Sequence, residues 1–205
     1  MNKYFTSKPQ GNMKDETSRN ILLRFLNLSP ENLVLAKQIH GNRVAAVNRA
    51  DAGKFAESCD GLVTCDKSLI LGIFTADCMP VLMSSKNGYV RAAVHAGWRG
   101  LADGIIENAV EIFKKDFNVL PEDIEVAVGP HIKQCCYEVN SDFEKIFNVA
   151  LINNKFSLSQ AAESKLKAVG VKDISVHCGC TFCGADNYFS YRKNKTEERQ
   201  LSLVF

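Results

Sequence analysis

Two short polar interruptions stand out in otherwise apolar sequence, at residues 75–80 and 95–100. The apolar runs beside them are typical of buried strands. Cys78 lies beside a carboxylate in the first interruption, and His95 lies near an arginine in the second. Such groups at the ends of buried strands cost stability unless they have a function. We therefore expect this region, together with His40, to form an active site.

His40, Cys78 and His95 can converge on one metal ion. Neighbouring strands lie about 4.8 Å apart, so side chains from adjacent strand ends and one loop can meet. Two imidazoles and one thiolate suit zinc, and three protein ligands leave the fourth position open for water or substrate. Zinc in such a site lowers the pKa of its bound water to roughly 7. The spacing alone equally permits two structural histidines and a core cysteine.

Copper is the second metal that these ligands permit. Two histidines, a cysteine and either Met79 or Met83 have the chemistry of a blue-copper site. A multicopper oxidase, however, needs several copper ions held mainly by histidine, and the whole chain has four histidines. This count excludes a conventional multicopper oxidase.

A second group of cysteines follows His177. Cys180 and Cys183 have the C-x-x-C spacing of a structural zinc clip or a redox pair, which is a weak signal without a second pair. Cys135 and Cys136 are adjacent in the sequence. We expect their side chains to diverge and not to ligate one ion together.

Two other functions remain open from the residues alone. Cys78 can act as a covalent nucleophile, with a histidine as its base and Asp77 to orient that base. Alternatively, a bound metal can stabilise a scaffold module that turns over no substrate. The metal content and the effect of alkylating Cys78 distinguish these possibilities from metal catalysis.

The totals are those of an ordinary soluble globular protein. The 205 residues suffice for one well-buried domain, and 46% of them are apolar and 23% charged. The net charge of +2 implies no general attraction to nucleic acid or to a membrane. The first residues contain no apolar signal core, and no stretch approaches about 18 apolar residues. We expect a cytoplasmic protein whose eight cysteines are thiols or metal ligands.

Short strands and a few helices must position these groups. The Asn87-Gly88 pair is a strong hairpin signal, and apolar side chains repeat at four-residue intervals from Leu101 to Phe117. The pattern predicts an α/β (α+β) fold, a single domain over residues 1–205 with one mixed β-sheet flanked by helices. The predicted strands are 33–36, 44–47, 61–65, 69–74, 81–84, 89–95, 124–128, 174–177 and 201–205. The first predicted helix begins at Thr17 or Ser18 and ends near Leu28. The other predicted helices span 101–117, 141–149 and 157–170.

Several motifs together resemble the laccase-domain (polyphenol oxidoreductase, YfiH-type) family, whose members are described as purine nucleoside phosphorylases. The resemblance runs from about residue 33 to residue 205. Residues 1–32 look like a shortened version of the family's first segment, with Lys8 where arginine is usual. The motifs are residues 38–41, 59–64, 75–82, 95–100, 129–132, 136–139, 180–181 and 188–192.

The resemblance implies a YfiH-like mixed-sheet fold and one zinc ion held by His40, Cys78 and His95; an older laccase label attached copper to this site. It implies phosphorolysis of adenosine, inosine, guanosine and methylthioadenosine to the base and ribose 1-phosphate, together with adenosine deamination. Some members are described as hydrolases that remove serine from peptidoglycan precursors. The expected partners are purine nucleosides and phosphate, without nucleic acid or membrane, in a monomer or homodimer.

Other residues of these motifs are candidates for catalysis. Asp77 is favoured over Glu138 as the proton carrier, although Asp77 can instead orient a histidine ligand. Arginine suits phosphate through its bidentate donors, and Trp98 can stack on a purine or pack beneath the strand end. The predicted catalytic residues are Asp77, Cys78 and Arg99, and those predicted to bind substrate or phosphate are Arg43, Arg192 and Trp98.

Overall fold

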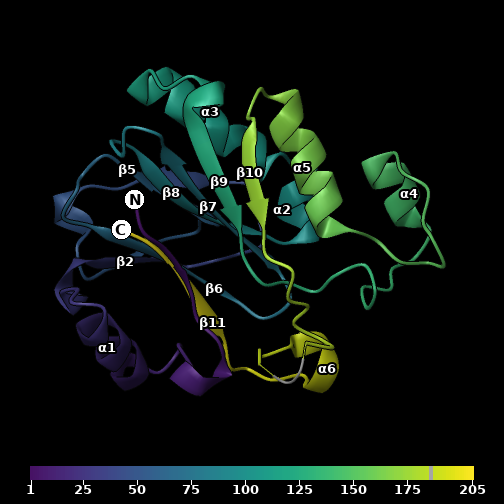
Figure 1. Ribbon diagram of the computed structural model, residues 1–205, viewed down its shortest axis with the longest axis horizontal. Coiled ribbons are helices and arrows are strands. Elements are labelled where there is room, and N and C mark those ends of the chain that lie inside the picture. Colours follow the sequence, from purple (N-terminus) through teal and green to yellow (C-terminus); the bar gives the residue numbers. More distant parts are fainter. Residues whose placement is uncertain (185–186) are drawn as a thin grey trace.

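The computed structural model describes residues 1–184 and 187–205, and it consists of two packed β-sheets with helices on their outer faces (Figure 1). The strands are β1 (Lys3–Phe5), β2 (Leu33–Ala36), β3 (Val44–Ala46), β4 (Phe55–Ala56), β5 (Gly61–Thr64), β6 (Ile70–Thr75), β7 (Met79–Ser85), β8 (Arg91–Ala96), β9 (Ile124–Val128), β10 (Asp173–Val176) and β11 (Gln200–Val204). The helices are α1 (Glu16–Phe25), α2 (Trp98–Ala102), α3 (Ile105–Phe117), α4 (Asp142–Phe147), α5 (Leu158–Ala168) and α6 (Tyr191–Asn194).

Both sheets are mixed. The smaller sheet has the order β1-β11-β6-β2-β4, and the larger has the order β10-β9-β7-β8-β5-β3. In the smaller sheet, β2 runs parallel to both β4 and β6, and the other pairs are antiparallel. In the larger sheet, β9/β10 and β3/β5 are the parallel pairs. The fold is therefore mixed α/β, as the sequence predicts.

Strands β2, β5, β7, β8 and β11 are buried on both faces because alternate side chains enter different apolar layers. Leu71 of β6 and Leu82 of β7 meet in one cluster between the two sheets. On the far side of the larger sheet, Val81 and Met83 pack in a second cluster together with residues of α3 and α5. On the far side of the smaller sheet, α1 covers a third cluster. Figure 1 shows the resulting order of layers, with α3 and α5 above the sheets and α1 below them.

The mixed β-sheet core that the sequence predicts is divided between two sheets. Strands apolar on both faces need cover on both sides, and that cover can come from a helix or from a second sheet. The sequence pattern is the same in the two cases. The Asn87-Gly88 hairpin is confirmed: Gly88 has a φ of 69°, and its N–H donates to the Ser85 carbonyl between β7 and β8.

Two helix boundaries differ from the prediction. The first helix is capped by Asp15, whose side chain accepts a hydrogen bond from the Ser18 N–H, and not by Thr17 or Ser18. The predicted helix over 101–117 is two helices, α2 and α3, because Gly104 has a φ of 88° between them. Glycine reaches this left-handed conformation without steric cost, and the change of direction lets both helices pack on the sheet.

Three elements were not predicted, namely β1, β4 and α6. Each has at most four residues, which is too short for a hydrophobic period to stand out. Short 3-10 turns also occur at Lys8–Gln10, Pro30–Asn32, Arg49–Asp51 and Pro121–Asp123. Within the described part of the chain, no helix combines the length and apolarity needed to span a bilayer.

Candidate metal centre

His40, Cys78 and His95 lie together where three strands end. His40 follows β2, Cys78 lies in the loop that connects β6 to β7, and His95 is the penultimate residue of β8. Antiparallel pairing sets Pro80 opposite His95, which brings the start of β7 to the end of β8. The ligand atoms of all three side chains lie within 4.8 Å of one another. The two imidazole rings are 4.9 Å apart and nearly perpendicular.

Asp60 connects the two histidines. Its carboxylate is fully buried and accepts hydrogen bonds from the backbone N–H groups of Ile39, His40 and Gly41, at 3.0, 2.9 and 2.8 Å. The same carboxylate lies 2.7 Å from His95 Nδ1. A proton on Nδ1 leaves Nε2 as the lone-pair donor, which is the usual arrangement of a metal-binding histidine.

Asp60 is absent from the sequence-based prediction, although it lies inside the motif at residues 59–64. The available signal was a carboxylate immediately before a fully buried strand, between Cys59 and Gly61. A buried carboxylate needs several hydrogen-bond donors, and the loop that carries His40 supplies three of them. The partner loop is remote in the sequence, so only the fold identifies it.

Cys78 and His95 form a charged pair. Burial alone would lower the pKa of His95, but Cys78 and the hydrogen bond to Asp60 raise it to about 9. Burial would raise the pKa of Cys78, but His95 and His40 lower it to about 6. The cysteine is therefore a thiolate at neutral pH. A thiolate is the form of cysteine that binds metals or attacks as a nucleophile.

The donor set and the space around it fit a metal ion. Gly97 faces all three ligands: a Cβ added there would lie 3.2 Å from Cys78 Sγ, 3.4 Å from His40 Cδ2 and 3.7 Å from His95 Cε1. Because Gly97 has no side chain, the space enclosed by the three side chains stays open. One thiolate and two imidazoles around such a space match a mononuclear zinc centre with an open position.

Asp77 has a different role from that of Asp60. Its backbone is in the left-handed region at φ 88°, a strained conformation for a residue with a side chain. One carboxylate oxygen accepts from Thr181 Oγ1 at 2.7 Å, and the other accepts from the Arg192 N–H at 2.6 Å. The suggestion that Asp77 orients a histidine ligand is therefore wrong, because Asp60 occupies that position.

The metal ligands line a cavity of about 630 Å³. The cavity also contains the predicted residues Asp77, Arg99, Arg192 and Trp98. Arg43 does not line it: its guanidinium donates to the carbonyls of residues 57 and 58, on another part of the surface. Glu138 is likewise not in the cavity wall, and its backbone carbonyl accepts from Arg192.

The cavity wall is strongly basic. Among the described lining residues, Asp77 is the one carboxylate, whereas five side chains are cationic. The sequence predicted two of these cations. Lys14 and Arg199 both approach Glu197, at 3.5 and 3.8 Å. The five cationic residues are Lys14, Arg99, Arg192, Lys195 and Arg199.

Aromatic side chains complete the wall. Trp98 packs on Phe143 at 5.1 Å between ring centroids, and the Arg99 guanidinium lies over its indole at 4.5 Å. Arg192 lies over the Tyr137 ring at 5.3 Å. Burial, with a smaller contribution from Cys78, raises the pKa of Tyr137 to about 12. Its hydroxyl is therefore a neutral hydrogen-bond donor at physiological pH.

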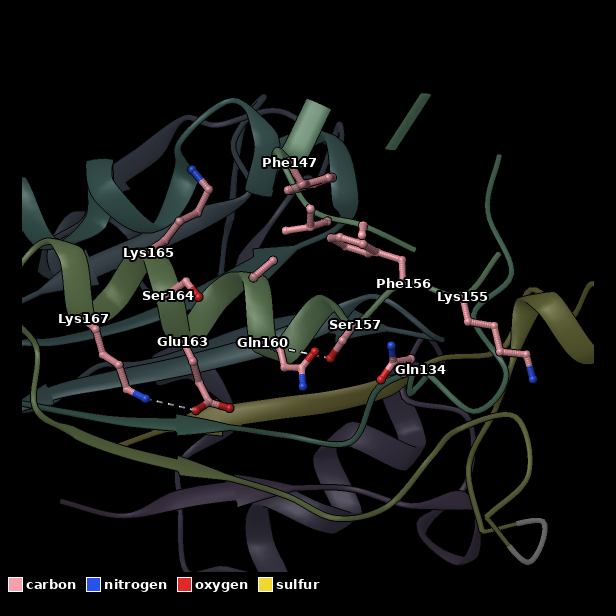
Figure 2. A pocket seen from close by; sticks show the side chains of 13 residues that line it. Gln134, Phe147, Lys155, Phe156, Ser157, Gln160, Glu163, Ser164, Lys165 and Lys167 are labelled. Carbon is pink, nitrogen blue, oxygen red and sulfur yellow. Dashed lines mark hydrogen bonds and ion pairs between the residues drawn. The ribbon is translucent and has the colours of Figure 1, made fainter. Parts of the chain in front are cut away.

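A second cavity, of about 510 Å³, lies beside α5 (Figure 2). Its lining residues include neither histidine nor cysteine. Glu163 pairs there with Lys167 at 3.6 Å, and Ser157 caps α5 by accepting from the Gln160 N–H. These contacts stabilise the helix itself. The candidate metal ligands His40, Cys78 and His95 line the first cavity and not this one.

Comparisons with known proteins agree with the fold. The family model described as multi-copper polyphenol oxidoreductase laccase matches residues 11–205. A purine nucleoside phosphorylase of Aquifex aeolicus is 35% identical over 190 residues, which are 90% of this chain and 88% of that protein. Purine nucleoside phosphorylase YfiH of Escherichia coli is 31% identical over 201 residues, covering 93% and 80%.

Solved structures show the same architecture. The crystal structure of YlmD from Geobacillus stearothermophilus superposes with a TM-score of 0.87 at 28% identity, covering 92% of this chain and 80% of that one. A Bacillus licheniformis protein described as hypothetical protein YfiH gives a TM-score of 0.86 at 25% identity, covering 92% and 79%.

Proposed function

The chain belongs to the family described as multi-copper polyphenol oxidoreductase laccase, and from this premise we propose that it is a zinc-dependent purine nucleoside phosphorylase. The relatives named purine nucleoside phosphorylase support an enzyme of this type. The observation that carries the proposal is a single cavity in which one set of metal ligands faces five cationic side chains. A metal centre beside a basic wall suits a reaction that uses phosphate.

His40, Cys78 and His95 would hold the metal. We propose zinc and not copper because thiolate and imidazole are both ordinary zinc ligands, and three protein ligands leave the fourth position of a catalytic zinc open. The family description names several copper ions, and four histidines in the chain cannot hold them. A zinc ion bound there supplies a Lewis-acid centre with an open coordination position.

Phosphate would bind to the basic wall. In phosphorolysis a phosphate oxygen bonds to C1′ of the ribose, the bond from C1′ to the purine nitrogen breaks, and the departing base takes a proton. Arg99 and Arg192 have flat guanidinium groups that suit the two oxygens of a phosphate. Both already rest on aromatic rings, so little side-chain freedom is lost on binding.

The nucleoside would occupy the aromatic part of the cavity. Trp98 and Tyr137 offer a stacking surface and a hydroxyl donor within one wall. A volume of about 630 Å³ lies within the range of small-molecule sites. We propose adenosine, inosine, guanosine and methylthioadenosine as substrates, because their shared purine and ribose are the parts that these side chains can contact.

Adenosine deamination is the second proposed activity. It needs an activated water, a proton carrier and no phosphate. The carboxylate of Asp77 lies in the same cavity wall as the metal ligands, which supports it as the proton carrier. The Thr181 and Arg192 contacts would hold this carboxylate in place during the reaction.

Product analysis tests both activities. Zinc-loaded protein is incubated with adenosine, with and without phosphate, and adenine, inosine and hypoxanthine are resolved. Adenine and ribose 1-phosphate are expected only with phosphate, and inosine is expected in either case. Phosphate-independent release of serine from a muramyl-serine precursor, or oxidation of a polyphenol, without any nucleoside turnover would overturn the proposal.

A pair of arginine variants tests the phosphate site. Arg99→Ala should raise the KM for phosphate about tenfold or more, because a charge-assisted contact is worth roughly 1.5–3 kcal/mol. Arg43→Ala is the matched control, since Arg43 lies outside the cavity. Equal phosphate KM values for the two variants would contradict the assignment.

A further inference from the structure

Two loops meet next to Asp77. One follows β9 and the other follows β10, and a bridge pairs His131 with Cys180 between them. The Thr181 N–H donates to the His131 carbonyl at 3.1 Å, and the Lys133 N–H donates to Cys180 Sγ at 3.4 Å. These contacts fix the spacing of the two loops.

The loops bring four cysteines into one cluster: Cys135, Cys136, Cys180 and Cys183. Their sulfur atoms all lie within 4.8 Å of one another. The adjacent cysteines converge, contrary to the sequence prediction, because a tight turn folds the chain back: the N–H groups of Cys136 and Tyr137 both donate to the Lys133 carbonyl at 2.9 Å.

The sulfur spacing fits a tetrahedral zinc ion. A Zn–S distance of about 2.3 Å places tetrahedral sulfur atoms about 3.8 Å apart. Cys135 Sγ and Cys183 Sγ are 3.7 Å apart. All four are free thiols, since a disulfide would require a sulfur separation of about 2.05 Å.

We propose that Cys135, Cys136, Cys180 and Cys183 bind a second zinc ion, separate from the one in the cavity. Four thiolates fill a tetrahedral coordination shell and leave no open position, so this zinc is structural and not catalytic. It joins the loop after β9 to the loop after β10.

Within the cluster, the surroundings of Cys180 favour its thiolate form. Burial raises the pKa of Cys180, but backbone N–H groups of Lys133, Cys183 and Phe182 outweigh it and lower that pKa to about 7. Burial and neighbouring thiols raise the pKa values of Cys135 and Cys136. Zinc displaces the remaining thiol protons on binding. The resulting negative charge lies near Lys133, whose pKa is lowered overall by burial although Cys178 and Cys180 oppose that shift.

The position of the cluster indicates what it stabilises. Ile132, in the first loop, donates its N–H to the Asp77 carbonyl at 3.0 Å. Thr181, in the second loop, donates its hydroxyl to the Asp77 carboxylate. A zinc ion that joins the loops therefore holds two of the three hydrogen-bond donors that the described part of the chain gives the strained Asp77, the third being the Arg192 N–H.

Metal counting on the full chain tests the second site. The wild type and three variants are saturated with zinc, freed of loosely bound ions and analysed for metal. We expect two zinc ions per chain in the wild type, one in Cys183→Ser and one in His40→Ala. Cys178→Ser is the matched control and should keep two, because Cys178 is exposed and outside the cluster. One zinc in the wild type, lost completely in His40→Ala, would overturn the proposal.

Cobalt absorption and alkylation identify the ligands in the wild type itself. These two measurements therefore hold even if the Cys183→Ser variant does not fold. Cobalt substitution should give the intense thiolate-to-cobalt absorption of a tetrathiolate centre, and His40→Ala should retain it. Alkylation followed by peptide mapping should show that zinc protects Cys183, an exposed residue, but not Cys178. Equal alkylation of Cys183 with and without zinc, or a Cys135–Cys183 disulfide in the zinc-saturated protein, would contradict the site.

Discussion

At the scale of single residues, the buried carboxylate of Asp60 contacts both His95 and the loop that carries His40. It holds the His40 loop by three backbone N–H groups and orients the His95 ring. Burial would raise its pKa, but the hydrogen bonds from His95, Gly41 and Ile39 lower it overall. Asp60 thus stays ionised and positions two of the three candidate metal ligands.

Asp60→Asn should lower the affinity for zinc about 10- to 100-fold, the usual effect of losing a carboxylate behind a histidine ligand. An amide keeps the size of the side chain but replaces one acceptor oxygen with a donor. Competition with a chromophoric chelator measures the affinity. Asp66→Asn is the control, because Asp66 caps a surface turn at Ser68 and does not line the cavity. Unchanged affinity in Asp60→Asn would contradict this role.

His131 gives the fold a specific sensitivity to acid. Burial lowers its pKa from 6.5 to about 4, and within the described part of the chain its Nε2 atom has no hydrogen-bond partner. Between pH 4 and pH 6.5, His131 is protonated in the unfolded chain but neutral in the folded chain. The free energy of unfolding therefore falls as the pH drops from 6.5 to 4, by up to about 3 kcal/mol from this group.

His131→Gln should flatten this part of the pH profile, because glutamine does not titrate. Urea unfolding at several pH values between 4 and 7, with chelator present, measures the free energy of unfolding of both proteins. Chelator removes the separate effect of metal release. Parallel profiles for the two proteins would show that His131 does not cause the acid sensitivity.

At the scale of elements, the turn from β8 into α2 determines how closely the ligands approach. Gly97 has φ −71° and ψ 165°, a conformation open to any residue, so its importance lies in the missing side chain. Gly97→Ala should lower the zinc affinity by about tenfold or more, comparable to losing a ligand's support, because the new methyl crowds Cys78 and His40.

Gly41→Ala is the matched control for Gly97→Ala. Its added Cβ meets Ile39 and Asp60 at 3.6 Å or more, which is ordinary contact. Zinc affinity near that of the wild type is expected. If both variants lost affinity to the same degree, crowding at the ligands would not be the cause.

Much of this site could be predicted from the sequence, for reasons that particular residues make clear. Cys78 and His95 stand out because each breaks an apolar strand pattern, His40 is one of only four histidines in the chain, and the family resemblance implies the same three ligands. Asp60 and the cationic side chains Lys14 and Arg199 depend on contacts between remote segments, which no local pattern encodes.

The same reasoning explains the errors at the element scale. The sequence assigns Arg43 to phosphate because arginine suits phosphate and Arg43 belongs to the motif around His40, yet its guanidinium faces the carbonyl of Glu57. The strands of both sheets were recognised, but their division was not, because alternate apolar side chains do not reveal what covers them. Leu82, for example, is buried between the sheets, whereas Val81 beside it faces α3 and α5.

At the scale of the whole molecule, the apolar layer between the sheets carries much of the stability. Leu82→Ala should lower the free energy of unfolding by about 2 to 5 kcal/mol, the range for large-to-small changes in a core. The zinc content should not change, since Leu82 does not line the cavity. Leu120→Ala, at a site 51% exposed, should cost less than about 0.5 kcal/mol. Equal losses in the two variants, measured by urea unfolding, would contradict this account of the layer.

Strand β11 lies between β1 and β6 in the smaller sheet, and this position has a consequence for synthesis in the cell. Ser202 pairs with Ile73 on one side and with Phe5 on the other, so strands made early must wait for one made much later (Figure 1). Until β11 leaves the ribosome, the apolar edge of β6 has no partner there. Loop closure over such distances is slow, and open strand edges invite aggregation. A nascent chain of this protein would therefore benefit from a chaperone until its last strand emerges.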